Sequence, residues 1–259
     1  MLIGITGSGS SGKSSFIKQF LKKYPKYTTP EETYRDIPNL DLYDNGTEES
    51  QRLIRDFMFK QAKEAWSKRD TKRHVFHDRT LLDNLACTQY LYTKGKILGE
   101  EIISDEFLVE SINMTRESMG FYHIIYFTPI SDSSPIPVRD DVDVEYRNSI
   151  DTILKSYYYA YKHDDRELQL FPEKNCASVQ ELIGDTQMRL EYAGMILDED
   201  GVVIGGTNSI GMTPVDPLLY DAEGNESNLN ALQAPFEISS EGDLFDIGLD
   251  KQITTDTNW

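Results

Sequence analysis

The sequence predicts an α/β fold of three layers, with helices on both sides of a mostly parallel sheet of five strands. Two observations predict it. Strand-like and helix-like segments take turns along residues 1–194, and a glycine-rich run joins the first predicted strand to the first predicted helix. Regular alternation of this kind favours parallel strands connected by crossover helices. Residues 1–194 are therefore predicted to form one domain, and residues 195–259 a small β-rich or extended appendage.

The first strand is expected over residues 2–6, where a short β-type run precedes the glycines. Further strand-like runs lie at 75–78, 122–128 and 167–171. Apolar residues recur with helical spacing in the segments 13–23, 50–69, 81–91, 105–119 and 144–161. Ser178 and Glu181 have the spacing of a capping box, so the last helix of the domain is expected to begin there.

The predicted appendage differs from the domain in charge. Residues 195–259 contain 13 acidic residues and one basic residue, whereas residues 1–194 contain 31 acidic and 25 basic residues. Turn-forming residues separate its short apolar pieces, which favours hairpins or extended chain. Asp198, Asp200 and Gly201 resemble the start of a calcium loop, but the remaining ligand spacing is absent, so an acidic turn is expected.

The composition excludes several classes of protein. Of 259 residues 39% are hydrophobic, which is enough for a core and excludes wholesale disorder. The formal net charge of −18 disfavours nucleic acid as a partner, unless a local basic patch binds it. Cys87 and Cys176 have no metal-like spacing, so neither a disulfide scaffold nor a zinc site is expected.

No apolar run approaches the roughly 20 residues that a membrane span needs. We therefore expect no membrane contact and a cytoplasmic location, in the host cytoplasm if the source is viral. The sequence leaves the oligomeric state open, and a homodimer is possible.

The run from Gly7 to Ser14 fits the phosphate-loop pattern G-x-x-x-x-G-K-[ST] between a predicted strand and a predicted helix. In such a loop, backbone N–H groups and the helix N-terminus bind phosphate. The residues expected to form this cradle are Gly7, Ser8, Gly9, Ser10, Ser11 and Gly12. Lys13 is expected to reach the β and γ phosphates of ATP, Ser14 to bind Mg²⁺, and Ser15 to contact the α-phosphate.

A phosphate loop indicates a nucleotide but no particular reaction. A GTPase would carry Asp-x-x-Gly followed by [NT]-K-x-D, whereas the related string at 67–70 precedes the Asp-x-x-Gly strings at Asp198 and Asp221. A mechanical ATPase would carry an acidic pair at the end of the relevant strand. Here Asp78 is followed by Arg79. The sequence therefore disfavours both classes.

The run HVFHDRTLLDNLACTQYLY over residues 74–92 resembles the Asp-Arg motif of thymidylate kinases and the Glu-Arg-Ser motif of deoxynucleoside kinases. The resemblance implies that Asp78 orients Mg²⁺ through water or takes the acceptor's proton, and that Arg79 holds the acceptor. Alternatively, Asp78 and Arg79 cap the next helix and pair with Asp83. His77 is expected to be a core histidine.

Two further segments resemble parts of small-substrate kinases. Residues 29–35 resemble the Glu-x-x-Arg segment of ribosylnicotinamide kinases, which implies that Glu32 is a general base or sugar anchor and that Arg35 binds an acceptor phosphate. A solvated helix start is the alternative.

Arg139 and Arg147 follow the 122–128 strand at the position of the lid in this superfamily, where arginines close over the transferred phosphoryl group. Salt bridges from these arginines to nearby aspartates are the alternative.

Taken together, residues 1–194 resemble the P-loop nucleoside and nucleotide kinase superfamily. Within it they are most similar to thymidylate-kinase-like and ribosylnicotinamide-kinase-like proteins of bacteriophages. The resemblance implies phosphoryl transfer from ATP, with Mg²⁺, to a small-molecule nucleoside or nucleoside monophosphate. Two alternatives stay open at this point. One is a kinase acting on a hydroxyl of DNA or RNA, and the other is a non-catalytic ATP-binding sensor.

Overall fold

The computed structural model describes residues 1–38, 40, 46–68, 74–130, 143–162 and 178–202. Its strands are β1 (Leu2–Thr6), β2 (Tyr27–Thr28), β3 (His74–Asp78), β4 (Ile124–Phe127) and β5 (Ser178–Glu181). Its helices are α1 (Lys13–Lys23), the 3-10 turn η1 (Tyr34–Asp36), α2 (Glu48–Ser67), α3 (Leu81–Leu98), α4 (Asp105–Met119), α5 (Val144–Lys162) and α6 (Thr186–Gly194).

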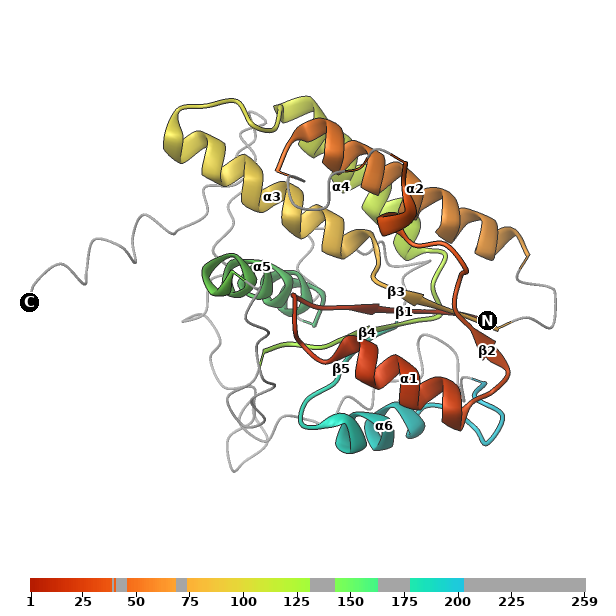
Figure 1. The fold of residues 1–259 in the computed structure, drawn as a ribbon. Helices are drawn as coiled ribbons and strands as arrows, with labels where there is room; N and C mark the ends of the chain where they lie inside the picture. Colours follow the sequence, from red (N-terminus) through yellow and green to blue (C-terminus); the bar gives the residue numbers. More distant parts are fainter. Residues whose placement is uncertain (39, 41–45, 69–73, 131–142, 163–177, 203–259) are drawn as a thin grey trace, which may run out of the picture.

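The five strands form one sheet in the order β2-β3-β1-β4-β5, and all neighbouring strands run parallel. Helices α1 and α6 cover one face of the sheet, and α2, α3, α4 and α5 cover the other (Figure 1). The three-layer α/β fold predicted from the alternation of segments is therefore confirmed. Every residue of β1 is buried, and its sequence LIGIT is accordingly apolar as far as Ile5, without the alternation of a half-exposed strand.

Strand register brings the loops of interest to one edge of the sheet. Ile5 of β1 pairs with Asp78, the last residue of β3, and Thr6 pairs with Phe127, the last residue of β4. The glycine-rich loop after β1 and the residues after β3 therefore leave the sheet side by side. Ligands of open α/β sheets bind at this carboxyl edge.

Aromatic side chains fix α1 against the sheet. Phe16 and Phe20 are fully buried, and each packs on Phe76 of β3 and Tyr126 of β4 with ring centroids 4.9–6.3 Å apart. Aromatic contacts of this kind add to the hydrophobic stabilisation of the buried rings. They hold the start of α1, and with it the end of the glycine-rich loop, in a fixed place.

The end of the sheet differs from the sequence prediction. Residues Ser178–Glu181 form β5, paired in parallel with β4, so the helix start expected from their capping-box spacing is wrong. The last helix begins at Thr186, capped by Asp185, whose carboxylate accepts from the N–H of Met188. A capping pattern is a local signal, and pairing along β4 overrides it. The strand expected at 167–171 lies outside the described residues.

The chain after α6 stays against the domain as far as Val202. Leu197 is 4% exposed in the core between α1 and α6, and the hydroxyl of Tyr27 donates to the carbonyl of Gly201. Asp200 pairs with Lys26. The Asp198 carboxylate accepts from the turn's own N–H groups at Asp200 and Val202. The rest of the predicted appendage lies outside the described residues.

In the described part of the chain, no helix combines the length and the apolar character that a membrane span requires.

Candidate active site

The glycine-rich loop between β1 and α1 needs glycine for steric reasons. A Cβ at Gly7 would lie 2.3 Å from Oγ1 of Thr128, a contact that no packed side chain tolerates. Gly12 has φ 86° and caps α1, and Ser10 also takes a left-handed conformation, with φ 52°. At Gly9, by contrast, an added Cβ would meet no atom of the described residues within 4 Å, so these residues leave room beside the loop for a bound group.

Lys13 folds back over the loop. Its ammonium group donates to the carbonyls of Gly7 at 2.7 Å and Ser8 at 2.6 Å, and to the hydroxyl of Ser11 at 3.2 Å. Lys13 is 6% exposed. Burial, followed by the nearby charge of Arg79, lowers the pKa of Lys13 to about 7.

This pKa gives a testable pH dependence. Above pH 7 Lys13 is largely neutral in the ligand-free protein, whereas a bound phosphate favours its ammonium form. We therefore expect ADP binding at pH 8.5 to take up about one proton per molecule, because the phosphates of ADP are already ionised there. Calorimetry in buffers of different ionisation enthalpy measures this uptake. Lys13→Arg, which keeps its charge at every pH, should bind ADP with no uptake; equal uptake in both proteins would contradict the assignment.

Two arginines hold the middle of the loop. From α5, Arg147 donates through Nε to the carbonyl of Gly9 at 2.8 Å and through Nη2 to that of Ser10 at 3.4 Å. From α6, Arg189 donates through Nη1 to the carbonyl of Ser11 at 2.6 Å. Arg147 is 7% exposed and Arg189 2%. The sequence singled out Arg147 as a lid residue, and that role stays a prediction; the other lid candidate, Arg139, lies outside the described residues.

Asp83, on the first turn of α3, joins the two motifs of the site. One carboxylate oxygen accepts from the N–H of Gly7 at 3.2 Å and from the guanidinium of Arg79 at 2.9 Å. The other accepts from the N–H of Thr80, which caps the helix. Pairing of Arg79 with Asp83, weighed from the sequence as an alternative to acceptor binding, is therefore present. The same contact ties Arg79 to the phosphate loop.

We expect Asp83→Asn to lower the free energy of unfolding by about 3 kcal/mol, since it leaves the partly buried Arg79 cation unpaired. Urea unfolding measures the change. Asp105→Asn is the matched control, because Asp105 pairs with Lys96 at the surface and its loss should cost under about 1 kcal/mol. Equal losses in the free energy of unfolding for the two variants would show that the Asp83 contacts stabilise the fold no more than a surface ion pair does.

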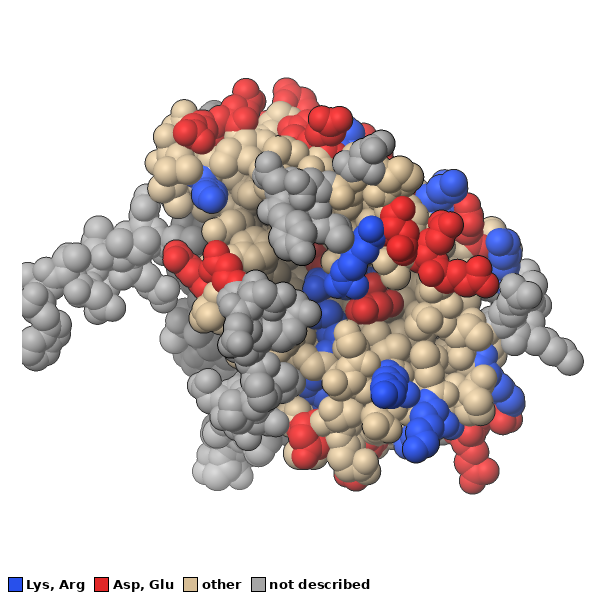
Figure 2. All heavy atoms as spheres, viewed as in Figure 1, with Lys and Arg blue, Asp and Glu red and all other residues tan. Residues whose placement is uncertain are grey.

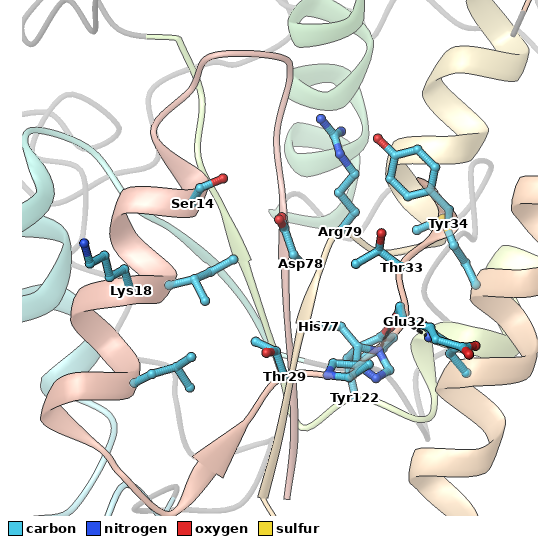
Figure 3. A pocket seen from close by; sticks show the side chains of 15 residues that line it. Ser14, Lys18, Thr29, Glu32, Thr33, Tyr34, His77, Asp78, Arg79 and Tyr122 are labelled. Carbon is cyan, nitrogen blue, oxygen red and sulfur yellow. Dashed lines mark hydrogen bonds between the residues drawn. The ribbon is translucent and has the colours of Figure 1, made fainter. Parts of the chain in front are cut away.

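A pocket of about 380 Å³ lies beside the loop, between α1, the end of β3 and residues 29–34. Figure 3 shows Ser14 of α1 and Asp78 of β3 facing the same space, with Arg79 and Tyr34 across from Ser14. Arg79 reaches this position through a left-handed backbone with φ 82°, which is unfavourable for a residue with a Cβ. The pocket also has an apolar part, formed by Ile17, Leu21, Pro30, Met58 and Tyr122.

The structure does not bring all predicted acceptor residues together. Glu32 lines the pocket, but its carboxylate points away from Asp78 in Figure 3. The guanidinium of exposed Arg35 lies 5.1 Å from the ring centroid of Tyr34, and Arg35 is not among the described residues that line the pocket. Buried His77 bonds to the hydroxyl of Tyr122, and burial lowers its pKa to about 4, as suits a core histidine.

Several buried polar atoms around the loop make no hydrogen bond with the described residues. They are Thr6 Oγ1, Ser8 Oγ, Ser10 Oγ and Asp78 Oδ1. Buried polar atoms are almost always satisfied in native proteins, so a group of them around one loop points to a ligand. Hydroxyl and carboxylate oxygens beside a phosphate loop fit a nucleotide together with Mg²⁺. Ser14 and Asp78, which both line the pocket, are the residues that could hold such an ion.

Charge supports the same conclusion. Lys and Arg side chains gather in and beside a hollow on the face shown in Figure 2, next to one acidic group, and further acidic side chains gather on the surface above it. On a chain with a net charge of −18, this hollow is a place where an anion is favoured.

Comparison with known proteins agrees with this geometry. A family model described as an AAA domain matches residues 2–169. The chain belongs to this AAA domain family. Membership of this family does not specify a reaction, so the chemistry of this AAA domain depends on the residues of its site. No sequence match is found among curated proteins.

Solved structures show the same fold as this AAA domain at low sequence identity. Deoxyadenosine kinase from M. mycoides, with products dCMP and dCDP bound, has a TM-score of 0.53 at 16% identity, over 74% of this chain and 95% of the kinase. NadR protein in complex with NAD and AMP-PNP has a TM-score of 0.50 at 12% identity, over 79% of this chain and 50% of NadR. The predicted resemblance to P-loop nucleotide kinases is confirmed at the level of the fold.

The sequence does not indicate that Arg189 contacts the loop, and it indicates only part of the role of Asp83. Arg189 is a lone cation in a short helix, and nothing local marks it as facing the loop. From the sequence, Asp83 is expected only as a partner of Arg79. Its position three residues after Thr80 is the capping-box signal that could have marked it as buried at a helix start.

Proposed function

We propose that this protein is a kinase that transfers the γ-phosphoryl group of ATP, with Mg²⁺, to a small-molecule nucleoside or nucleoside monophosphate. One observation carries the proposal. Ser14, at the end of the phosphate loop, and Asp78, which has a carboxylate oxygen without a hydrogen bond to the described residues, line one pocket that also has an apolar part.

The donor side consists of the loop from Gly7 to Ser15. Its N–H groups and the N-terminus of α1 would bind the phosphates, and protonated Lys13 would turn from the loop carbonyls to the β and γ phosphates. Mg²⁺ would be held through Ser14 and, directly or through water, Asp78, and it would neutralise charge that develops on the phosphates.

The acceptor side lies across the pocket. The acceptor oxygen would attack the γ-phosphorus as the bond to the β-phosphate oxygen breaks and ADP leaves. Asp78 would accept the proton of an acceptor hydroxyl, and Arg79, held by Asp83, would orient the acceptor. Glu32 lines the pocket and Arg35 lies in η1, and both side chains would have to turn toward Asp78 and Arg79 on acceptor binding.

The likeness to deoxyadenosine kinase concerns the fold, so the acceptor class depends on the pocket and on experiment. We would measure ADP release from Mg·ATP with nucleosides, ribosylnicotinamide, nucleoside monophosphates and hydroxyl-ended oligonucleotides. Stimulation by one small acceptor, lost in Lys13→Met and Asp78→Asn, is the expected result. Stimulation by oligonucleotides alone would instead identify a polynucleotide kinase, and tight ATP binding without stimulated release would identify a sensor.

A further inference from the structure

We propose that Arg189 is a positioning residue of the phosphate loop, and that its buried charge is compensated by a bound polyphosphate. Nothing in the sequence motif includes this residue, which lies far along the chain on α6. The inference rests on the phosphate-binding half of the proposed function and is independent of phosphoryl transfer.

Consecutive carbonyls of the loop each accept a hydrogen bond from a cationic side chain. Lys13 bonds to the first two, at Gly7 and Ser8, and Arg147 bonds to the next two. Arg189 completes the series at Ser11. Because α5 and α6 lie on opposite faces of the sheet, the two arginines hold the loop from both sides (Figure 1).

These bonds determine where the N–H groups point. In a trans peptide the carbonyl of one residue and the N–H of the next point in opposite directions. An arginine that holds the Ser11 carbonyl therefore also sets the direction of the Gly12 N–H, at the residue where the chain turns through φ 86° into α1. Without that bond, the carbonyl could rotate toward the phosphate, where two negatively charged oxygens would repel each other.

The charge of Arg189 supports a role in ligand binding. Its side chain is almost completely buried, and its Nε makes no hydrogen bond with the described residues. Burial lowers its pKa, and Asp185 nearby opposes this in part. In the described part of the chain no carboxylate forms an ion pair with Arg189. Among the described residues the charge of Arg189 is therefore uncompensated, and an anion bound at the loop would reduce the cost of burying it.

The test uses the full chain and inorganic tripolyphosphate, which binds through phosphate contacts alone. We expect Arg189→Gln to bind tripolyphosphate about tenfold more weakly than wild type, because the charged hydrogen bond that holds the Ser11 carbonyl is lost. Arg189→Lys, which keeps the charge, should recover part of the loss. Arg52→Gln, which removes a half-buried arginine of α2 that pairs with Glu48 away from the loop, is the matched control and should bind normally.

Stability separates a positioning role from a merely structural one. We expect ligand-free Arg189→Gln to unfold at the wild-type urea midpoint or above it, while the stabilisation added by tripolyphosphate falls. Wild-type affinity in the glutamine variant, or a lower ligand-free midpoint with unchanged ligand stabilisation, would overturn the proposal.

If the glutamine variant does not fold, hydrogen exchange in the wild-type protein decides the question. Tripolyphosphate should slow amide exchange in α6 as well as in the loop, because the Arg189 bond joins them. Protection of the loop without any change in α6 would overturn the inference. Tripolyphosphate binding without kinase activity would leave this inference intact and refute only the proposed function.

Discussion

Lys13→Met is expected to lower the rate of phosphoryl transfer about a thousandfold, because it removes a buried cation from the centre where negative charge develops. The fold should survive, since burial already disfavours the charged form of this lysine and lowers its pKa to about 7. Steady-state ADP release under saturating ATP and acceptor measures the effect.

Lys22→Met is the control for this variant, because Lys22 is exposed on the same helix and does not line the pocket. It should keep wild-type activity. If Lys13→Met kept activity within about tenfold of wild type, the loop would not be the donor site and the proposed function would fall.

The second large effect is expected at Asp78. Asp78→Asn keeps the shape of the side chain and removes its charge, so the residue can neither accept the acceptor's proton nor neutralise Mg²⁺ as effectively. We expect the rate of transfer to fall about 10²–10⁴-fold, while ADP binds nearly as well as to wild type. Single-turnover transfer and ADP calorimetry measure the two quantities separately.

Glu64→Gln, at an exposed position of α2, is the matched control and should leave both quantities unchanged. A parallel loss of ADP binding and transfer in Asp78→Asn would contradict a role in the chemical step, since it would show that Asp78 maintains the donor site.

Much of the site was predictable because its signals are local. A phosphate loop needs glycines where the chain turns, a lysine and a hydroxyl in one short run, and these stand together from Gly7 to Ser14. The position of Asp78 was predictable for a related reason. The strand-like run from Val75 ends in its carboxylate, and parallel strands place their carboxyl ends at one edge of a sheet.

The wrong prediction at Ser178 and Glu181 shows the limit of local signals. Their spacing satisfies the capping-box pattern, yet hydrogen bonding along β4 makes this segment a strand. Four residues are too few for periodicity to distinguish the two structures, so the neighbouring strand decides.

The sequence by itself determined the alternating α/β fold, the phosphate loop and the carboxylate at the end of β3, because each depends on residues that are close together in the chain. Only the tertiary structure decided that Asp83 joins Arg79 to the loop and that Arg189 holds the Ser11 carbonyl. These contacts link positions 76 and 178 residues apart in the sequence. Such a contact exists only once packing has brought α3 and α6 to the loop, so no local pattern in the sequence records it.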